Sequence, residues 1–159
     1  MAAFQDQIRG NFCFGCGADN PDGLQLKSGW DVDDPTLSVA QWTPWPIHVA
    51  GPRHILNGGI IATLLDCHGI VTALAETYRR EGREIGSEPD LWCATASLHI
   101  EYLRPAAIGS AVSLTGRTVG IEDRTATVEC ELHSDGKLRA LATIKAVQVP
   151  ESWRHGASS

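Results

Sequence analysis

Apolar and polar residues alternate along two segments in the second half of the chain, 96–103 and 126–133. A period of two is typical of a strand that has one face on a core and the other face toward solvent. Further strands are expected over 111–119 and, after the tight-turn pair Asp135-Gly136, over 137–149. Four consecutive strands with short connections predict an antiparallel sheet.

Residues 58–78 follow a different pattern, because this segment is apolar nearly all round. Such a pattern is typical of a helix that is buried on most of its sides. Asn57 is a favourable N-cap for this helix, and the charged, Gly-containing stretch 79–89 after it is expected to form a mobile loop. Two shorter strands are expected before the helix, over 24–31 and 36–43.

The length of 159 residues suits a single domain, 1–159. Turn-forming residues are frequent over 1–23, which predicts a loop-rich N-terminal cap, and the polar stretch 150–159 is expected to be a disordered tail. A helix without a polar face needs a sheet that curls around it. The predicted fold is therefore α+β, with a curved antiparallel sheet of about six strands wrapped around one long central helix.

Asp66 is the only formally charged residue between Ile55 and Ala75. A carboxylate in a buried helix is costly to keep ionised unless another group pairs with it, so such residues are often functional. The structural alternative is that Asp66 is hydrogen-bonded to a neighbour and simply holds the fold together. The position alone makes Asp66 the first candidate for chemistry.

The start of the same helix, Asn57-Gly58-Gly59, is a second candidate feature. Unpaired N–H groups at a helix start carry partial positive charge, and glycine allows a ligand to approach the backbone, so this segment could hold a developing oxyanion. A plain N-cap followed by two flexible glycines is the structural alternative. Gly58 and Asp66 are about 12 Å apart along the helix axis, so they could act on one ester only if a second copy ran antiparallel nearby.

The stretch 57–66 resembles the helix start of phenylacetate-pathway and THEM-type thioesterases of the hotdog fold. Their pattern is His-Gly-Gly, a short apolar run and then an acidic residue. Residues 98–105 are similar to the strand after that helix, and 13–17 with 20–24 resemble the N-terminal signature of one bacterial subgroup. The resemblance spans about 13–147 and implies hydrolysis of an acyl-CoA thioester by a homodimer or a dimer of dimers.

The resemblance also implies roles for individual residues. Asp66 would be the nucleophile or the general base, and the Gly58 N–H would polarise the thioester carbonyl. Thr95 matches a position where the family often has a Ser or Thr that orients water or the acidic residue. Asn57 departs from the pattern, since the family usually has His there. Substrate binding is expected at His54, Gly59, His68 and Arg104.

Asn57 in place of His keeps a different class of function open, a non-catalytic protein that binds acyl-CoA or another acyl ligand. Hydration or dehydration on the same fold ranks last, because the His and acid spacings typical of those enzymes are absent. Cys13 and Cys16 form a lone C-x-x-C, without a second Cys or His pair at zinc-site spacing, so no metal is expected. His68 beside Asp66 has a structural alternative as a satisfied core histidine.

Composition limits the partners of the chain. The net charge of −6 disfavours nucleic acid and anionic membranes as partners. Phosphates of coenzyme A could still be bound by Arg104 or by the run Arg79, Arg80 and Arg83, for which a solvated surface is the simpler interpretation. No cofactor is expected beyond the coenzyme A of the substrate. The polar N-terminus and five cysteines without secreted-scaffold spacing favour the cytoplasm.

Overall fold

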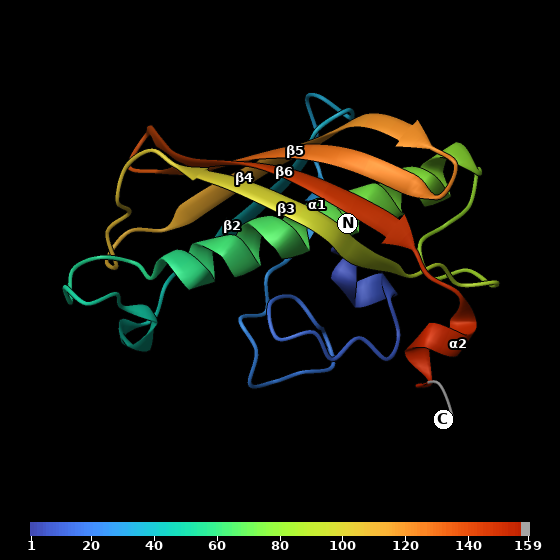
Figure 1. Ribbon diagram of the computed structural model, residues 1–159, viewed down its shortest axis with the longest axis horizontal. Coiled ribbons are helices and arrows are strands. Elements are labelled where there is room, and N and C mark those ends of the chain that lie inside the picture. Colours follow the sequence, from blue (N-terminus) through green and yellow to red (C-terminus); the bar gives the residue numbers. More distant parts are fainter. Residues whose placement is uncertain (157–159) are drawn as a thin grey trace.

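The computed structural model describes residues 1–156 and contains one six-stranded antiparallel sheet that curves over a long helix (Figure 1). The strand order is β1-β2-β4-β5-β6-β3. The strands are β1 (Ser28–Trp30), β2 (Ser38–Trp42), β3 (Cys93–Tyr102), β4 (Val112–Glu122), β5 (Thr125–Ser134) and β6 (Lys137–Gln148). The helices are α1 (Gly58–Arg80), the short α2 (Glu151–Arg154) and two 3-10 turns, Gln5–Gln7 and Pro46–His48.

This arrangement confirms the predicted hotdog fold, with α1 as the central helix. The helix packs mainly on β4, β5 and β6. Leu64 and Leu65 on α1 and Ile144 on β6 are fully buried. Gly69 allows this close packing, because a Cβ there would lie 2.7 Å from the Ile144 Cδ1 atom. By length and apolarity α1 could cross a membrane. However, 61% of its most apolar 18-residue stretch is buried inside the protein, as in a core helix.

The N-terminal segment covers the side of α1 that faces away from the sheet (Figure 1, blue). Phe4 and Leu26 are buried in the same core cluster as the helix. The Phe4 N–H donates a hydrogen bond of 2.8 Å to the Ser28 carbonyl, which ties the segment to β1. The predicted loop-rich cap is therefore the layer that closes the core opposite the sheet.

Two strands differ from the pattern-based prediction. β1 begins only at Ser28, because Gln25 has a φ of 56°, in the left-handed region that an extended strand does not use. β3 was expected to bury one face, yet Leu98 is 37% and Tyr102 54% exposed. The physical reason is that β3 is the last strand of the sheet, so within one chain little packs on it.

The C-terminal segment also differs from the prediction of a disordered tail over 150–159. Residues 151–154 form α2, and Arg154 makes an ion pair with Asp90 and lies over the Trp92 ring. These contacts hold α2 against the loop before β3. Residues 157–159 lie outside the described part of the chain.

His68 is a fully buried residue of α1 that joins the helix to the first two strands. One ring nitrogen, Nδ1, lies 2.9 Å from the Ser28 Oγ atom, and the other, Nε2, lies 3.1 Å from the Ser38 Oγ atom. Burial lowers the pKa of His68 from 6.5 to about 4, since a charged ring would lose its hydration. The neutral imidazole is thus part of the folded core.

We predict that His68 makes the protein acid-sensitive. Its pKa is lower in the folded than in the unfolded state, so its contribution to stability is complete above pH 6.5 and is lost as the pH falls toward about 4. Denaturant unfolding across this pH range should show that His68 lowers the free energy of unfolding by up to about 1.4 kcal/mol for each pH unit of acidification. His68→Gln should lower the free energy of unfolding by about 1–3 kcal/mol at neutral pH, because the serine hydroxyls lose their partner. The free energy of unfolding of this variant should fall less steeply with acidification than that of the wild type. Equal slopes for both proteins would contradict this prediction.

Candidate functional site

A cavity of about 590 Å³ lies beside the middle of α1, between the helix, the start of β3, the N-terminal cap and α2. Its wall is mostly apolar, and Asp66 is the one charged residue among the described residues that line it. The apolar lining residues come from the cap, α1, the loop before β3 and α2, and include Ile8, Phe12, Ile70, Val71, Leu74, Trp92 and Trp153. The cavity therefore combines an apolar binding volume with one carboxylate.

Asp66 is half-buried on this wall and is held by β3. The Thr95 hydroxyl donates a hydrogen bond of 2.8 Å to the Asp66 Oδ1 atom. The pairing of β3 with β6 shifts register between Thr95 and Ser97, an irregularity of the kind that re-aims a side chain. The structure thus brings together two of the residues that the sequence analysis singled out, 29 positions apart in the chain.

The surroundings of Asp66 favour its protonated form more than water does. Burial raises the pKa of the Asp66 carboxyl, and the nearby Cys13 adds to this rise, while the hydrogen bond from Thr95 opposes it. A carboxylate with a raised pKa is a stronger base than an exposed one. It can take a proton from water or attack a carbonyl carbon, provided that a substrate enters the cavity.

The start of α1 forms a second, separate feature. The Asn57 side-chain oxygen accepts hydrogen bonds from the Gly59 N–H (2.7 Å) and the Ile60 N–H (3.3 Å), as expected of an N-cap. Tyr102 donates a hydrogen bond of 2.7 Å to the Gly58 carbonyl. Within residues 1–156 the Gly58 N–H has no hydrogen-bond acceptor, so this donor is available to a ligand.

A hollow of about 340 Å³ lies at this helix start and is lined by Gly58, Tyr102 and Arg104, among others. The Asp66 cavity is a different one, since the two share no lining residue. Asp66 follows Gly58 by eight positions, so the two residues are about 12 Å apart along the helix axis. A single chain therefore does not bring its own Gly58 to its own Asp66.

The remaining predicted binding residues lie in varied places. Arg104 is exposed at the helix-start hollow, and His54 is exposed in the turn before α1. His68 faces away from the cavity, with both ring nitrogens engaged and no exposed surface, so the structure does not support a role in substrate binding. Gly59 donates its N–H to Asn57, as the first turn of the helix requires.

The arginine run after the helix serves the fold. Arg79 and Arg80 both make ion pairs with Glu76, and Arg79 also lies 4.1 Å from the centre of the Trp30 ring. Arg83 makes an ion pair with Glu81 and donates to backbone carbonyls of the following loop. These contacts favour a structural role for the three arginines at the protein surface over binding of coenzyme A phosphates.

The sequence did not indicate that Trp153 and Cys67 line the same cavity. Trp153 lines the cavity from α2, a segment whose polar composition predicted no structure. Cys67 lines it from α1, and its sulfur lies 3.6 Å from that of Cys13. No spacing rule links residues so far apart in the chain, so only the folded structure could place them at the site.

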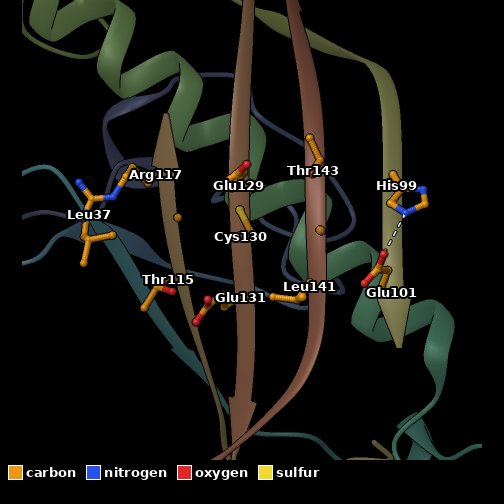
Figure 2. A pocket seen from close by; sticks show the side chains of 12 residues that line it. Leu37, His99, Glu101, Thr115, Arg117, Glu129, Cys130, Glu131, Leu141 and Thr143 are labelled. Carbon is orange, nitrogen blue, oxygen red and sulfur yellow. Dashed lines mark ion pairs between the residues drawn. The ribbon is translucent and has the colours of Figure 1, made fainter. Parts of the chain in front are cut away.

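A further hollow of about 650 Å³ lies on the outer face of the sheet, with α1 behind the strands (Figure 2). Its charged residues Arg117, Glu129 and Glu131 are exposed. His99 and Glu101 lie there as an exposed pair with 3.7 Å between Nε2 and Oε1 (Figure 2). Exposed charges keep their hydration and need no special partner, so we place the candidate active site at Asp66 instead.

Comparisons with known proteins identify the family. The model of the thioesterase superfamily matches residues 54–140, which include α1 and most of the sheet. The chain belongs to the thioesterase superfamily. A thioesterase superfamily protein from Shewanella loihica is 33% identical, with coverage of 79% of this chain and 91% of that one and a TM-score of 0.62. No curated protein matches the chain.

Two more distant structures share the fold of this thioesterase superfamily member. A phenylacetic acid degradation-related protein from Ralstonia eutropha is 21% identical, with coverage of 91% and 98% and a TM-score of 0.65. A protein from Streptococcus pneumoniae, described as a hypothetical thioesterase and solved with coenzyme A, is 15% identical, with coverage of 72% and 79% and a TM-score of 0.59. Membership of the superfamily supports thioester hydrolysis as the general class of activity.

Proposed function

We propose that this protein hydrolyses acyl-CoA thioesters to a free carboxylate and coenzyme A, with Asp66 as the catalytic carboxylate. The observation that carries the proposal is Asp66 itself, half-buried on the wall of an apolar cavity and held by the Thr95 hydroxyl. A solved relative of the same fold binds coenzyme A, which supports this class of thioester. The proposal requires no cofactor beyond the coenzyme A that is part of the substrate.

The cavity supports a hydrophobic or aromatic acyl group. Its apolar wall includes the rings of Phe12, Trp92 and Trp153, and its volume of about 590 Å³ lies within the range of small-molecule sites. The acyl group would lie along this wall, with its thioester carbon next to Asp66. Arg104, at the helix-start hollow, is a candidate for the phosphates of coenzyme A, although its guanidinium already donates to the Leu138 carbonyl.

A homodimer would complete this site. β3 is a ten-residue edge strand, and it carries the exposed apolar residues Leu98 and Tyr102. A long edge strand of this kind is a template for pairing with another chain. Antiparallel pairing of two β3 strands about a two-fold axis would run the two α1 helices antiparallel, so that Gly58 of one subunit approaches Asp66 of the other.

The reaction follows from these two groups. The Asp66 carboxylate removes a proton from a water molecule, which attacks the thioester carbon. Alternatively, the carboxylate attacks this carbon itself and forms a mixed anhydride, which water hydrolyses after coenzyme A has left. The free Gly58 N–H of the second subunit donates to the carbonyl oxygen, where negative charge develops. The carbon–sulfur bond then breaks, and coenzyme A leaves as the thiolate and takes up a proton.

The rival function is an acyl-CoA-binding protein without turnover, and Asn57 motivates it. The Asn57 oxygen is already occupied by two backbone N–H groups, so it is not free to accept a proton from water. Calorimetry with a non-hydrolysable acyl-CoA analogue, combined with a turnover assay over acyl-CoAs of varied length and aromaticity, separates the two functions. Saturable binding without release of thiol on any acyl chain would favour the binding protein.

We predict that Asp66→Asn lowers kcat/KM for the best acyl-CoA by about 10²–10⁴-fold, the typical contribution of a positioned acid or base. Thr95→Val should shift the acid limb of the pH–rate profile to higher pH, because the hydrogen bond from Thr95 lowers the pKa of Asp66. Thr95→Ser keeps the hydroxyl and is the matched control, with the limb expected near its wild-type position. Release of coenzyme A should be followed by chromatography, since the five cysteines of the protein react with thiol reagents.

The same Asp66→Asn protein tests whether Asp66 merely holds the fold. Because burial raises the pKa of Asp66, its charge destabilises the folded state once the pH exceeds that pKa. The melting temperature of Asp66→Asn near neutral pH should therefore equal or exceed that of the wild type. A clear drop in melting temperature with unchanged turnover would assign Asp66 to the fold and end the catalytic proposal.

The oxyanion role of Gly58 can be tested by removing a single N–H. Gly58 is the first residue of α1, where proline is tolerated, and Asn57 before it is already extended (φ −60°, ψ 131°). Gly58→Pro should lower kcat by about 10²–10³-fold. Gly58→Ala keeps the N–H, and its Cβ would lie 3.5 Å from the Tyr102 ring, an ordinary contact, so most activity should remain. Equal losses in both variants would point to crowding instead.

A further inference from the structure

Three cysteine sulfurs meet on one wall of the Asp66 cavity. Cys13 and Cys16 come from the N-terminal cap, and Cys67 comes from α1, one residue after Asp66. All three Sγ atoms lie within 4.8 Å of one another, and those of Cys13 and Cys67 are 3.6 Å apart. Cys16 and Cys67 are buried, whereas Cys13 is exposed. The mechanism proposed above uses none of these thiols.

The backbone of the cap is shaped around this cluster. A Cβ on Gly15 would lie 2.3 Å from the Cys67 sulfur, and a Cβ on Gly17 would lie 2.4 Å from the Cys13 nitrogen, so neither position has room for a side chain. The Gly17 N–H donates a hydrogen bond of 2.8 Å to the Cys13 carbonyl and closes the turn. The two glycines thus allow the C-x-x-C turn to press against α1.

The sulfur spacing suits a shared metal ion better than a disulfide. A disulfide needs sulfur atoms about 2.05 Å apart, far closer than the 3.6 Å between Cys13 and Cys67. Tetrahedral Zn²⁺ binds thiolates at about 2.3 Å, which places two sulfur ligands about 3.8 Å apart. Three sulfurs within 4.8 Å of one another need only small shifts to reach that spacing.

We propose that Cys13, Cys16 and Cys67 bind one Zn²⁺ ion, with the fourth coordination position open to water in the Asp66 cavity. Thiolate sulfur is a preferred ligand of zinc, and the thiols that are protonated in the free protein release their protons to solvent when the metal binds. The ion links the N-terminal cap to α1 directly beside Asp66. It therefore holds in place the cap side of the acyl-binding wall.

The test is a titration of metal-free, reduced protein with Co²⁺, which reports sulfur ligation and tetrahedral geometry through its absorption spectrum. We expect a thiolate-to-cobalt charge-transfer band and strong visible bands that saturate at one ion per chain and disappear when Zn²⁺ displaces Co²⁺. Cys13→Ser should weaken binding by more than about 100-fold, since loss of a direct ligand costs more than loss of a supporting contact. Cys13 is exposed, so this variant leaves the core intact.

Cys93→Ser is the matched control. Cys93 lines the same cavity but does not belong to the three-sulfur cluster, so this variant should bind Co²⁺ as the wild type does. A weak octahedral cobalt spectrum, or equal cobalt affinity in the wild type and Cys13→Ser, would overturn the zinc site. Formation of a Cys13–Cys67 disulfide without tetrahedral metal binding in the reduced protein would overturn it as well. These readouts do not involve turnover, so they stand or fall separately from the thioesterase proposal.

Discussion

The hydrogen bond between Thr95 on β3 and Asp66 on α1 is the contact on which the candidate site depends. An apolar helix at the centre of a curved sheet has almost no place for a carboxylate, because burial without a partner is costly. Asp66 is tolerated because it faces a cavity and receives the Thr95 hydroxyl. The contact therefore fixes the carboxylate on the wall of an apolar volume, and within residues 1–156 the other Asp66 oxygen accepts no hydrogen bond.

Asp66 and His68 show how two polar residues on one helix acquire different roles. They are two positions apart, so they point to different sides of α1. His68 points into the core, where Ser28 and Ser38 take both ring nitrogens, and burial keeps the ring neutral. Asp66 points to the cavity with one partner and a raised pKa. His68 is structural because both of its ring nitrogens have hydrogen-bond partners, whereas Asp66 has one partner and is available for reaction.

The periodicity of the sequence predicted much of the fold. Alternation over 126–133 and the Asp135-Gly136 turn located β5 and β6, and the all-apolar segment after Asn57 located α1. Periodicity does not encode strand order, so it assigned a buried face to β3, which is exposed at the sheet edge. Composition likewise predicted no structure where α2 forms.

The candidate site was predictable where its residues lie close to a recognisable pattern. Asp66 stands out as a lone charge, and Asn57 acts as the N-cap that its side chain favours. The approach of Cys67 to Cys13 and of Trp153 to the cavity could not be predicted, because the fold brings together segments that are distant in sequence. From the sequence, His68 could be either a substrate-binding residue or a buried core residue. Its hydrogen bonds with Ser28 and Ser38 decide for the core.

We propose that Asp66 of one subunit works with Gly58 of the other, and complementation between two inactive chains is a direct test of this shared site. Asp66→Asn and Gly58→Pro chains are co-expressed with different tags, and dimers that carry both tags are isolated. Each mixed dimer would hold one of its two sites with both groups intact, so the isolated mixed dimers should recover about half of wild-type turnover. Mixed dimers as inactive as the two parent proteins would contradict the shared site.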